Sequence, residues 1–254
     1  MAQSLEEWVE NEVLRLDDRS PAWLSDVYFF RDPRRPRTVD SSYFFSPADG
    51  VILYQRTVKP DEPILDIKGE SYSLRDALRE PEYNRESLVI GIFMTFFDVH
   101  VNRVPYRGTL SYRELPPIHT YNRPMLNVEN RLLYDLKIDL SEAAGYLRPN
   151  QRMVNRVYAP ALGETYRMLQ IADYDVSCIT PFRLQQNVPV QQGARFSQIR
   201  YGSQVDLVIP LSDRYRLTPV HQVSDHVKAG LDRLVHVAHQ PTGPDAAREE
   251  EKQA

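Results

Sequence analysis

Several kinds of residue and segment are scarce in this chain of 254 residues, and each scarcity excludes a class of protein. The single cysteine, Cys178, cannot form a disulfide within the chain, which favours a reducing, cytoplasmic setting over secretion. The most apolar run, 88–99, is shorter than the roughly 20 residues that a membrane-spanning helix needs. The ten glycines form no phosphate-binding loop, dinucleotide fingerprint or nucleophile elbow, so the commonest nucleotide-binding and hydrolase classes are excluded.

A surplus of positive charge is also missing. Lys+Arg 31 against Asp+Glu 35 give a net charge of −4, so composition predicts no nucleic-acid partner. The six histidines lack a zinc-type spacing with cysteine or clustered carboxylates, and we predict no metal site. On the same grounds His221 and His226 are interpreted as surface residues.

Proline and tyrosine, by contrast, are abundant. Nineteen prolines interrupt helices, and fifteen tyrosines suit half-buried strands. Short β-like runs follow from Tyr43 onward, and Pro-x-x-Gly turns at 47–50, 105–108 and 160–163 each precede one of them. The sequence therefore predicts an α+β fold that is mostly β, with antiparallel β-hairpin sheets and a few short helices.

The chain divides into three segments by pattern and composition. In the first, residues 5–16 predict an amphipathic helix whose polar face is acidic, which favours docking on the protein's own core over a membrane. Four arginines between 31 and 37 are interpreted as a solvated basic loop that balances nearby acids, with lipid phosphates as the alternative contact. The segments are a helical and basic lead (1–42), one β domain (43–239) and a disordered polar tail (240–254).

Three strings carry chemistry: SPADG at 46–50, FDVHVNRVP at 97–105 and ARFSQIRYGSQVDLVIP at 194–210. Taken singly, Asp49 is typical of a turn former and His100 of a buried structural histidine. Together and in this order, the strings resemble the phosphatidylserine decarboxylase family. KGESYSL at 68–74 and HVNR at 100–103 extend the resemblance, the latter as in the family's shorter bacterial and archaeal members.

The resemblance covers roughly 43–237. It includes VKAG at 227–230, where family members have a hairpin similar to those of biotinyl and lipoyl domains. The stretch 223–237 fits a helix and strands equally by periodicity, and the resemblance favours strands.

The resemblance implies a proenzyme that cuts itself between Gly202 and Ser203 and converts Ser203 into a covalent pyruvoyl cofactor. That ketone condenses with a substrate amine and accepts the electrons left when carbon dioxide departs. By the same resemblance Ser203, His100 and Asp49 are the catalytic residues, with the carboxylate orienting the imidazole. The sequence departs from the pattern at Arg103, where many members have a second histidine, because arginine cannot serve as a base.

The implied reaction is decarboxylation of phosphatidylserine to phosphatidylethanolamine, by a cytoplasmic protein held peripherally at the inner face of the cell membrane. Its implied partners are its own cleaved subunits and a second copy in a homodimer. One alternative is a decarboxylase of a soluble amino acid or amine metabolite with the same chemistry. Another is a degenerate, uncut homologue. A carrier protein modified at Lys228 is disfavoured because no Met-Lys pair occurs.

Overall fold

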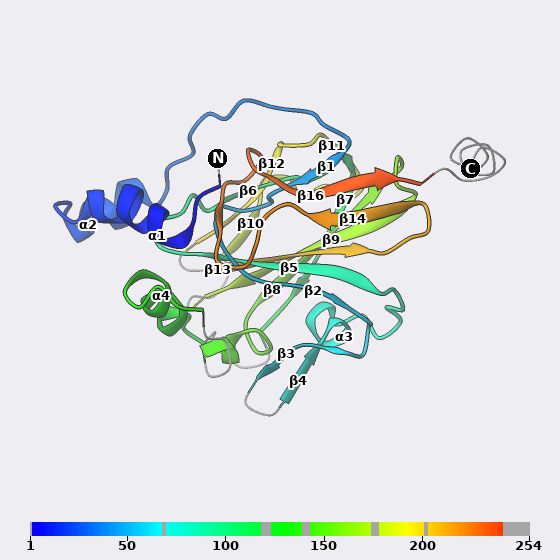
Figure 1. Cartoon of the computed structure of the whole chain (residues 1–254), viewed down its shortest axis with the longest axis horizontal. Helices are drawn as coiled ribbons and strands as arrows, with labels where there is room; N and C mark the ends of the chain where they lie inside the picture. Colours follow the sequence, from blue (N-terminus) through cyan, green and yellow to red (C-terminus); the bar gives the residue numbers. More distant parts are fainter. Residues whose placement is uncertain are drawn as a thin grey trace, which may run out of the picture.

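The computed structural model describes residues 2–67, 70–117, 123–138, 143–173, 178–200 and 203–240 (Figure 1). The helical elements are α1 (Leu5–Trp8), η1 (Val9–Val13), η2 (Leu14–Leu16), α2 (Pro21–Trp23), η3 (Leu24–Tyr28), α3 (Leu74–Leu78), α4 (Leu126–Leu133) and η4 (Ala143–Tyr146). The strands are β1 (Tyr43–Phe45), β2 (Gly50–Val58), β3 (Pro63–Ile67), β4 (Glu70–Ser73), β5 (Ser87–Met94), β6 (Val101–Arg103), β7 (Gly108–Leu115), β8 (Arg152–Ala159), β9 (Glu164–Ala172), β10 (Ile179–Pro181), β11 (Val188–Val190), β12 (Arg195–Ile199), β13 (Ser203–Pro210), β14 (Tyr215–Pro219), β15 (His226–Val227) and β16 (Arg233–His239).

One large sheet forms the centre of the molecule (Figure 1). Its eight strands are antiparallel in the order β11-β7-β8-β9-β13-β5-β2-β15. Two three-stranded sheets, β1-β16-β14 and β10-β12-β6, and the hairpin β3-β4 accompany it. The predicted mostly β fold of the α+β class is confirmed.

Both faces of the large sheet are covered, which explains why its central strands read as continuous apolar runs. Every residue of β5 and β13 is buried. Along β5, Val89 and Phe93 pack on the side of the N-terminal helical turns, α3 and α4. Ile90, Ile92 and Met94 pack on the opposite side, with β1, β12 and β16. Each central strand therefore contributes to two cores.

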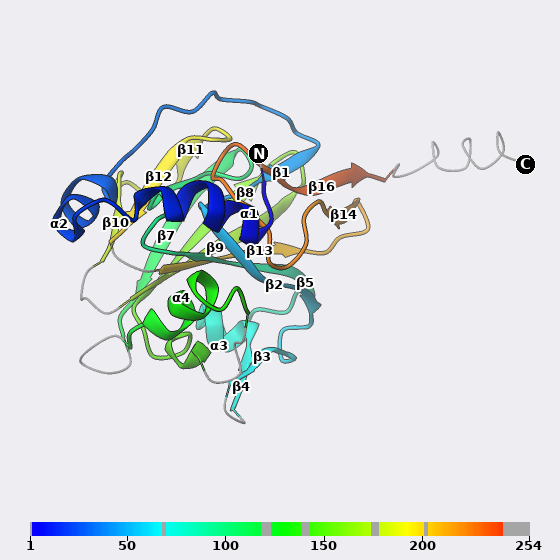
Figure 2. The ribbon, with the colours of Figure 1, turned by 60° about the vertical axis from the view of Figure 1, so that its left-hand side comes forward.

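The N-terminal helical turns follow the predicted amphipathic pattern. They begin at a capping box in which Ser4 and Glu7 satisfy each other's backbone amides. The apolar side chains buried in the core are Leu5, Trp8, Val9 and Val13. Figure 2 shows α1 lying against the body while α2 projects from it. The stripe docks on the protein's own core, as predicted.

The predicted turns also lead into strands. Strands β2 and β7 begin at the glycines of the first two Pro-x-x-Gly turns, and β9 begins directly after the third. The ambiguous stretch 223–237 forms β15, a turn and most of β16, so the preference for strands is confirmed. Gly202 and residues 241–254 lie outside the described residues, as do Lys68 and Gly69.

Candidate active site

Ser203 is the first residue of β13 and is held by strands on both sides. It pairs with Met94 at the end of β5 and with Ala172 at the end of β9. Its side chain is fully buried and lies on the same face of β13 as that of Val205. This face belongs to the core layer between the large sheet and β12. If the bond before Ser203 is cut, eight residue pairs with β5 still hold the new chain end in place.

The hydroxyl of Ser203 has a weak hydrogen-bond partner. Its Oγ lies 3.5 Å from Met94 Sδ, and Asn102 Nδ2 lies at the same distance from that sulfur. A thioether is a poor acceptor, so this contact leaves the hydroxyl available for chemistry. Asn102 is in turn fixed by Gln170, whose Nε2 donates to Asn102 Oδ1 at 2.6 Å and to Ser197 Oγ at 3.0 Å.

His100 is buried where β6 meets the end of β12. Its carbonyl accepts the amide of Ile199, four residues before Ser203. On its ring, Nδ1 lies 3.1 Å from the carbonyl of Asp98, and the ring of Phe29 packs against it at 4.2 Å between centroids. The structure thus gathers His100, Asn102 and Ser203 around the ends of β5, β6, β12 and β13.

Asp49 has a different partner from the one that the sequence predicts. Both of its carboxylate oxygens accept from Arg35, at 2.6 Å each, and Oδ1 also accepts the amide of Ala229 at 2.7 Å. Within the described part of the chain, none of its hydrogen bonds goes to His100. The carboxylate is 4% exposed and the Arg35 side chain 6%. This is a buried bidentate ion pair, the strongest geometry for these two groups.

Arg35 belongs to a segment, residues 29–35, that crosses the site and is here called the strap. Arg31 donates to the carbonyl of Phe97 at 2.6 Å. Asp32 pairs with Arg103 at 3.4 Å and with Arg195. Together with the Arg35–Asp49 pair and Phe29 on His100, these contacts join the strap to each of the three strings 46–50, 97–105 and 194–210. The interpretation of this stretch as solvated is therefore wrong for Arg31 and Arg35, which are bound to polar groups of the site, whereas the expected balancing of nearby acids is seen between Arg35 and Asp49.

Arg103 occupies the position where many family members have a second histidine. Burial lowers its pKa, and the neighbouring charge of Arg35 lowers it further. Its guanidinium donates to the carbonyl of Gly193 at 3.1 Å and pairs with Asp32. In this structure Arg103 holds the strap.

His226 corrects a second prediction. It is buried at 1% exposure, not a surface residue, and its Nε2 donates to Asp98 Oδ1 at 2.6 Å. Trp8 stacks on its ring at 4.3 Å with an interplanar angle of 8°. The sequence pattern did not indicate these contacts. Trp8 and His226 are more than a hundred positions apart, as are Asp98 and His226, and the three residues meet only in the folded protein.

Glu129 on α4 is a further carboxyl group that the sequence did not indicate. Its Oε1 accepts the amide of Phe96, in the turn that leads to His100, at 2.7 Å. Burial raises its pKa to about 7, and Asp173 and Asp98 add to the rise. Near neutral pH this carboxyl therefore holds its proton in a substantial fraction of molecules.

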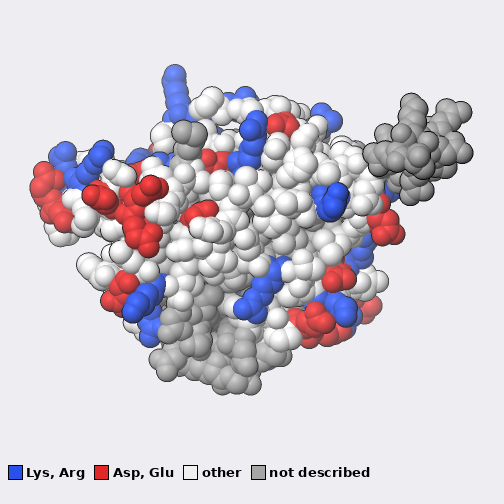
Figure 3. Space-filling view, viewed as in Figure 1, with Lys and Arg blue, Asp and Glu red and all other residues white. Residues whose placement is uncertain are grey.

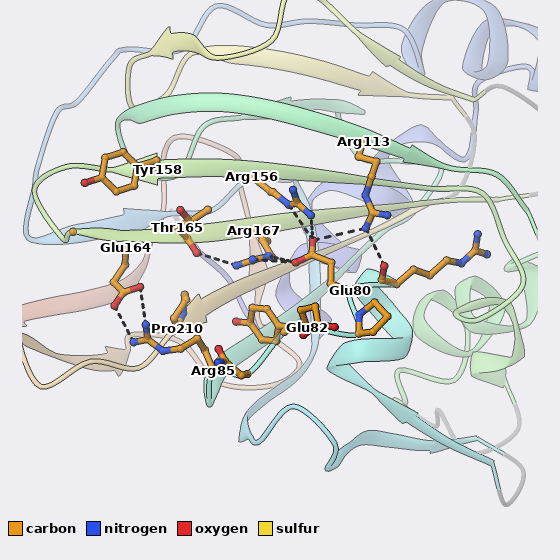
Figure 4. Close-up of a pocket in the computed structure, with 15 residues that line it drawn as sticks. Glu80, Glu82, Arg85, Arg113, Arg156, Tyr158, Glu164, Thr165, Arg167 and Pro210 are labelled. Carbon is orange, nitrogen blue, oxygen red and sulfur yellow. Dashed lines mark hydrogen bonds and ion pairs between the residues drawn. The ribbon is translucent and has the colours of Figure 1, made fainter.

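An arginine-rich pocket lies at the other end of the same strands (Figure 4). Pro210, the last residue of β13, lines it, whereas Ser203 begins that strand. Glu80 accepts from Arg156 and Arg167 there, and Arg85 pairs with Glu164. These internal pairs join the chain after α3 to the sheet, and the pocket is separate from the site around Ser203.

Two other kinds of feature are absent from the described ranges. No helix there combines the length and apolar character needed to cross a membrane. No group of three or more histidine, cysteine, aspartate or glutamate side chains is gathered there in a way that could hold a metal ion.

Comparison with known proteins decides the family. The family model for phosphatidylserine decarboxylase matches residues 25–234. The chain belongs to the phosphatidylserine decarboxylase family. Among its relatives, each named phosphatidylserine decarboxylase proenzyme, one from Desulfotalea psychrophila is 31% identical over 205 residues, which cover 80% of this chain and 75% of the relative. One from Burkholderia cenocepacia is 30% identical (78% and 75% covered), and one from Cupriavidus taiwanensis is 28% identical (80% and 78% covered).

Phosphatidylserine decarboxylases are carboxy-lyases with a covalent pyruvoyl group made from the proenzyme. The surroundings of Ser203 fit such a group. The residue heads a strand that is paired on both sides, and among the described residues its hydroxyl bonds weakly to the sulfur of Met94. Asn102 and Gln170 supply amide groups at the same place. The match with the family model also includes the strap, which the sequence resemblance from residue 43 onward did not.

Proposed function

We propose that this protein decarboxylates phosphatidylserine to phosphatidylethanolamine after cutting itself between Gly202 and Ser203. Family membership supports the reaction, and the relatives' name supports synthesis as a proenzyme. The observation that carries the assignment of Ser203 is its place at the head of a buried strand, where the contact of its hydroxyl within the described part of the chain is a weak one, 3.5 Å from Met94 Sδ.

Self-cleavage begins at the Ser203 hydroxyl. Oγ attacks the Gly202 carbonyl carbon, the peptide C–N bond breaks, and an ester forms with the amine of Ser203 released. β-Elimination then breaks the Cβ–Oγ bond and frees the carboxylate of Gly202. Hydrolysis of the resulting dehydroalanine consumes one water and releases ammonia, which leaves the pyruvoyl group on the smaller chain.

His100 is the base of this sequence in our proposal. Its backbone bonds to Ile199 of β12, the strand that leads to the cleavage position, and its ring contacts the Asp98 carbonyl and Phe29. Arg103 cannot take over this role. Asp49 acts through its ion pair with Arg35, so we assign it to holding the strap in place over the site.

The strap also suggests how a lipid reaches the site. It directly follows the projecting arm formed by α2 and η3, on which Val27 is 56% exposed and Trp23 half-buried, and Phe30 at the start of the strap is 43% exposed. Exposed apolar groups at one end of a molecule are suited to a membrane interface. We propose that the arm contacts the lipid surface and that this contact moves the strap away from His100.

Charge works against a simple electrostatic attraction. Figure 3 shows acidic side chains gathered over the N-terminal helical turns, and Glu6 and Glu7 on α1 and Glu10 on η1 are exposed. Binding through the arm should therefore depend on apolar insertion more than on anionic lipid. Vesicle flotation with zwitterionic vesicles, comparing the wild type with a Val27→Ser/Phe30→Ser variant, tests this. Equal flotation of the two proteins would remove the arm from the proposal.

Intact-mass measurement tests the proposed function. We expect the wild type to give two chains, the smaller beginning with pyruvoyl in place of serine, and Ser203→Ala to give one uncut chain. We expect His100→Ala to slow cutting by about 10²-fold or more, because a positioned general base typically contributes about 10²–10⁴-fold. A single uncut wild-type chain would favour the degenerate homologue and overturn the proposal.

Carbon-dioxide release then separates the substrates. Phosphatidylserine in mixed micelles is the expected substrate, and free serine at the same concentration is the soluble alternative. Release from free serine alone would replace the lipid by an amino acid while keeping the pyruvoyl chemistry. The homodimer implied by the family is tested on the same sample by light scattering.

A further inference from the structure

A buried pair of side chains, His226 and Asp98, lies directly behind the proposed base. Each side chain is 2% exposed, and His226 Nε2 donates to Asp98 Oδ1 at 2.6 Å. The pairing lowers the pKa of Asp98 although burial acts to raise it, so Asp98 is a carboxylate. A buried carboxylate with a charge-assisted hydrogen bond this short is tightly held.

Asp98 in turn helps to position the ring of His100. Its second oxygen, Oδ2, accepts both the amide and the hydroxyl of Thr95 at 2.8 Å, and its own amide donates to the Thr95 carbonyl. These bonds close the turn 95–98 at the end of β5, next to the residue that pairs with Ser203. The carbonyl of Asp98 then lies 3.1 Å from Nδ1 of His100. An acceptor at Nδ1 selects the tautomer that leaves Nε2 as the basic nitrogen.

His226 is itself fixed from two sides. Trp8 stacks face to face on the His226 ring, and the backbone of His226 forms two hydrogen bonds with the backbone of Gln3. On the other side β15 pairs with the start of β2, immediately after Asp49. The imidazole therefore has little freedom to leave Asp98.

The two partners lie on opposite sides of the proposed cleavage position. Asp98 and His100 precede it, whereas His226 follows it and would belong to the smaller chain. In the turn after β15 the Ala229 amide donates to Asp49, so the smaller chain would contact both Asp49 and Asp98. A contact that spans the two products can keep the base aligned after the backbone is cut.

We propose that His226 is a positioning residue for His100: its hydrogen bond to Asp98 fixes the turn 95–98 and thereby the ring orientation of the base, both during cleavage and afterwards from the smaller chain. This inference rests on the proposed role of His100 and assigns His226 no contact with substrate. The proposed role explains the presence of a histidine at position 226, outside the strings that carry the family resemblance. A histidine can donate to a buried carboxylate and stack on a tryptophan at the same time.

Two substitutions separate the hydrogen bond from the packing. His226→Gln keeps an N–H donor at the same reach and gives up the stack on Trp8. His226→Phe keeps the stack and gives up the donor. The readouts are the first-order rate of chain cutting and, per mole of cut chain, kcat and KM for phosphatidylserine.

We expect His226→Phe to lower the cutting rate and kcat by about 100-fold with KM unchanged, the size of effect that a small displacement of a catalytic group produces. His226→Gln should stay within roughly fivefold of the wild type. Rescue by glutamine is a result that a purely structural role of the ring would not give. Wild-type rates for His226→Phe, or equal losses in both variants, would overturn the inference.

Folding and the underlying assignment are controlled separately. His221→Gln is the matched control. His221 lies close to His226 in the chain, but its contact with Asp225 is long, at 3.7 Å, and its side chain is 21% exposed. If His226→Phe does not accumulate as folded protein, Trp8→Leu replaces it: this variant keeps the donor, so wild-type rates support the inference and a 100-fold loss overturns it. Failure of His100→Ala to slow cutting would instead reject the role of His100 itself.

Discussion

Arg35 and Asp49 face each other with two parallel hydrogen bonds of 2.6 Å inside the protein, although the first belongs to the lead segment and the second to the Pro-Ala-Asp-Gly turn. The guanidinium also donates to the Ala229 carbonyl at 2.7 Å. The aspartate that the family resemblance marks as catalytic is thus the anchor of the strap. Its nearest cation in this state is an arginine, and the base His100 is oriented by other groups.

Removing this arginine should destabilise the protein strongly. Arg35→Ala leaves the carboxylate of Asp49 buried with one backbone donor, and breaking a buried pair in this way costs about 3–5 kcal/mol. We expect a lower free energy of unfolding in urea by that amount. Arg34→Ala is the matched control, because Arg34 is exposed and adjacent, and it should change stability by less than about 0.5 kcal/mol. Equal stability of the two variants would show that the pair does not hold the strap.

Asp49→Asn tests the same pair from the other side. Asparagine keeps the turn and one acceptor for Arg35 or Ala229, but it lacks the negative charge. We expect the variant to fold with a lower melting temperature and to cut itself more slowly, because the strap then positions Phe29 on His100 less firmly. A time course of chain cutting at a temperature well below the melting point measures this. Cutting at the wild-type rate would reduce Asp49 to a former of the turn.

Gly50, the last residue of that turn, is predicted to be irreplaceable for a steric reason. Its φ is +149°, and a Cβ there would lie 2.1 Å from the carbonyl oxygen of Phe93. We expect Gly50→Ala to cost about 3 kcal/mol or more of stability, since both the backbone and β5 would have to shift. Gly193→Ala is the control: its φ is +75° but nothing lies within 4 Å of the added atom, so only the backbone strain of about 1 kcal/mol remains. Thermal unfolding of the two variants should separate them clearly.

The sequence predicted the strands better than the partners of its polar residues, and the reason is physical. Strand patterns and Pro-x-x-Gly turns are local, so 47–50 and the β2 that follows could be recognised within a few residues of each other. The ion pair of Arg35 and the hydrogen bond of His226 join segments far apart in the chain and depend on which surfaces the fold buries. A run of arginines between prolines has the composition of a solvated loop. Only the three-dimensional arrangement reveals that one of its members reaches a buried carboxylate.

Asp206 gives a prediction for the dependence of stability on pH. It is 1% exposed on β13, and Oδ1 accepts from Tyr54 at 2.9 Å and from Gln204 at 2.6 Å. Burial raises its pKa from 3.8 to about 6, against the hydrogen bonds of Gln204 and Tyr54, which lower it.

Because the folded state binds this proton more tightly than the unfolded state, the contribution of Asp206 to stability is complete below about pH 4 and is lost as the pH rises through about 6. The loss amounts to at most about 3 kcal/mol, since one pKa unit corresponds to about 1.4 kcal/mol. Asp206→Asn stays neutral throughout, so its free energy of unfolding should lack this decline between pH 4 and 7 and should exceed that of the wild type at pH 7. Urea unfolding across that range, with the exposed Asp213→Asn as control, measures the difference. Parallel pH profiles for wild type and Asp206→Asn would mean that Asp206 is already ionised at pH 4 and that its hydrogen bonds outweigh its burial.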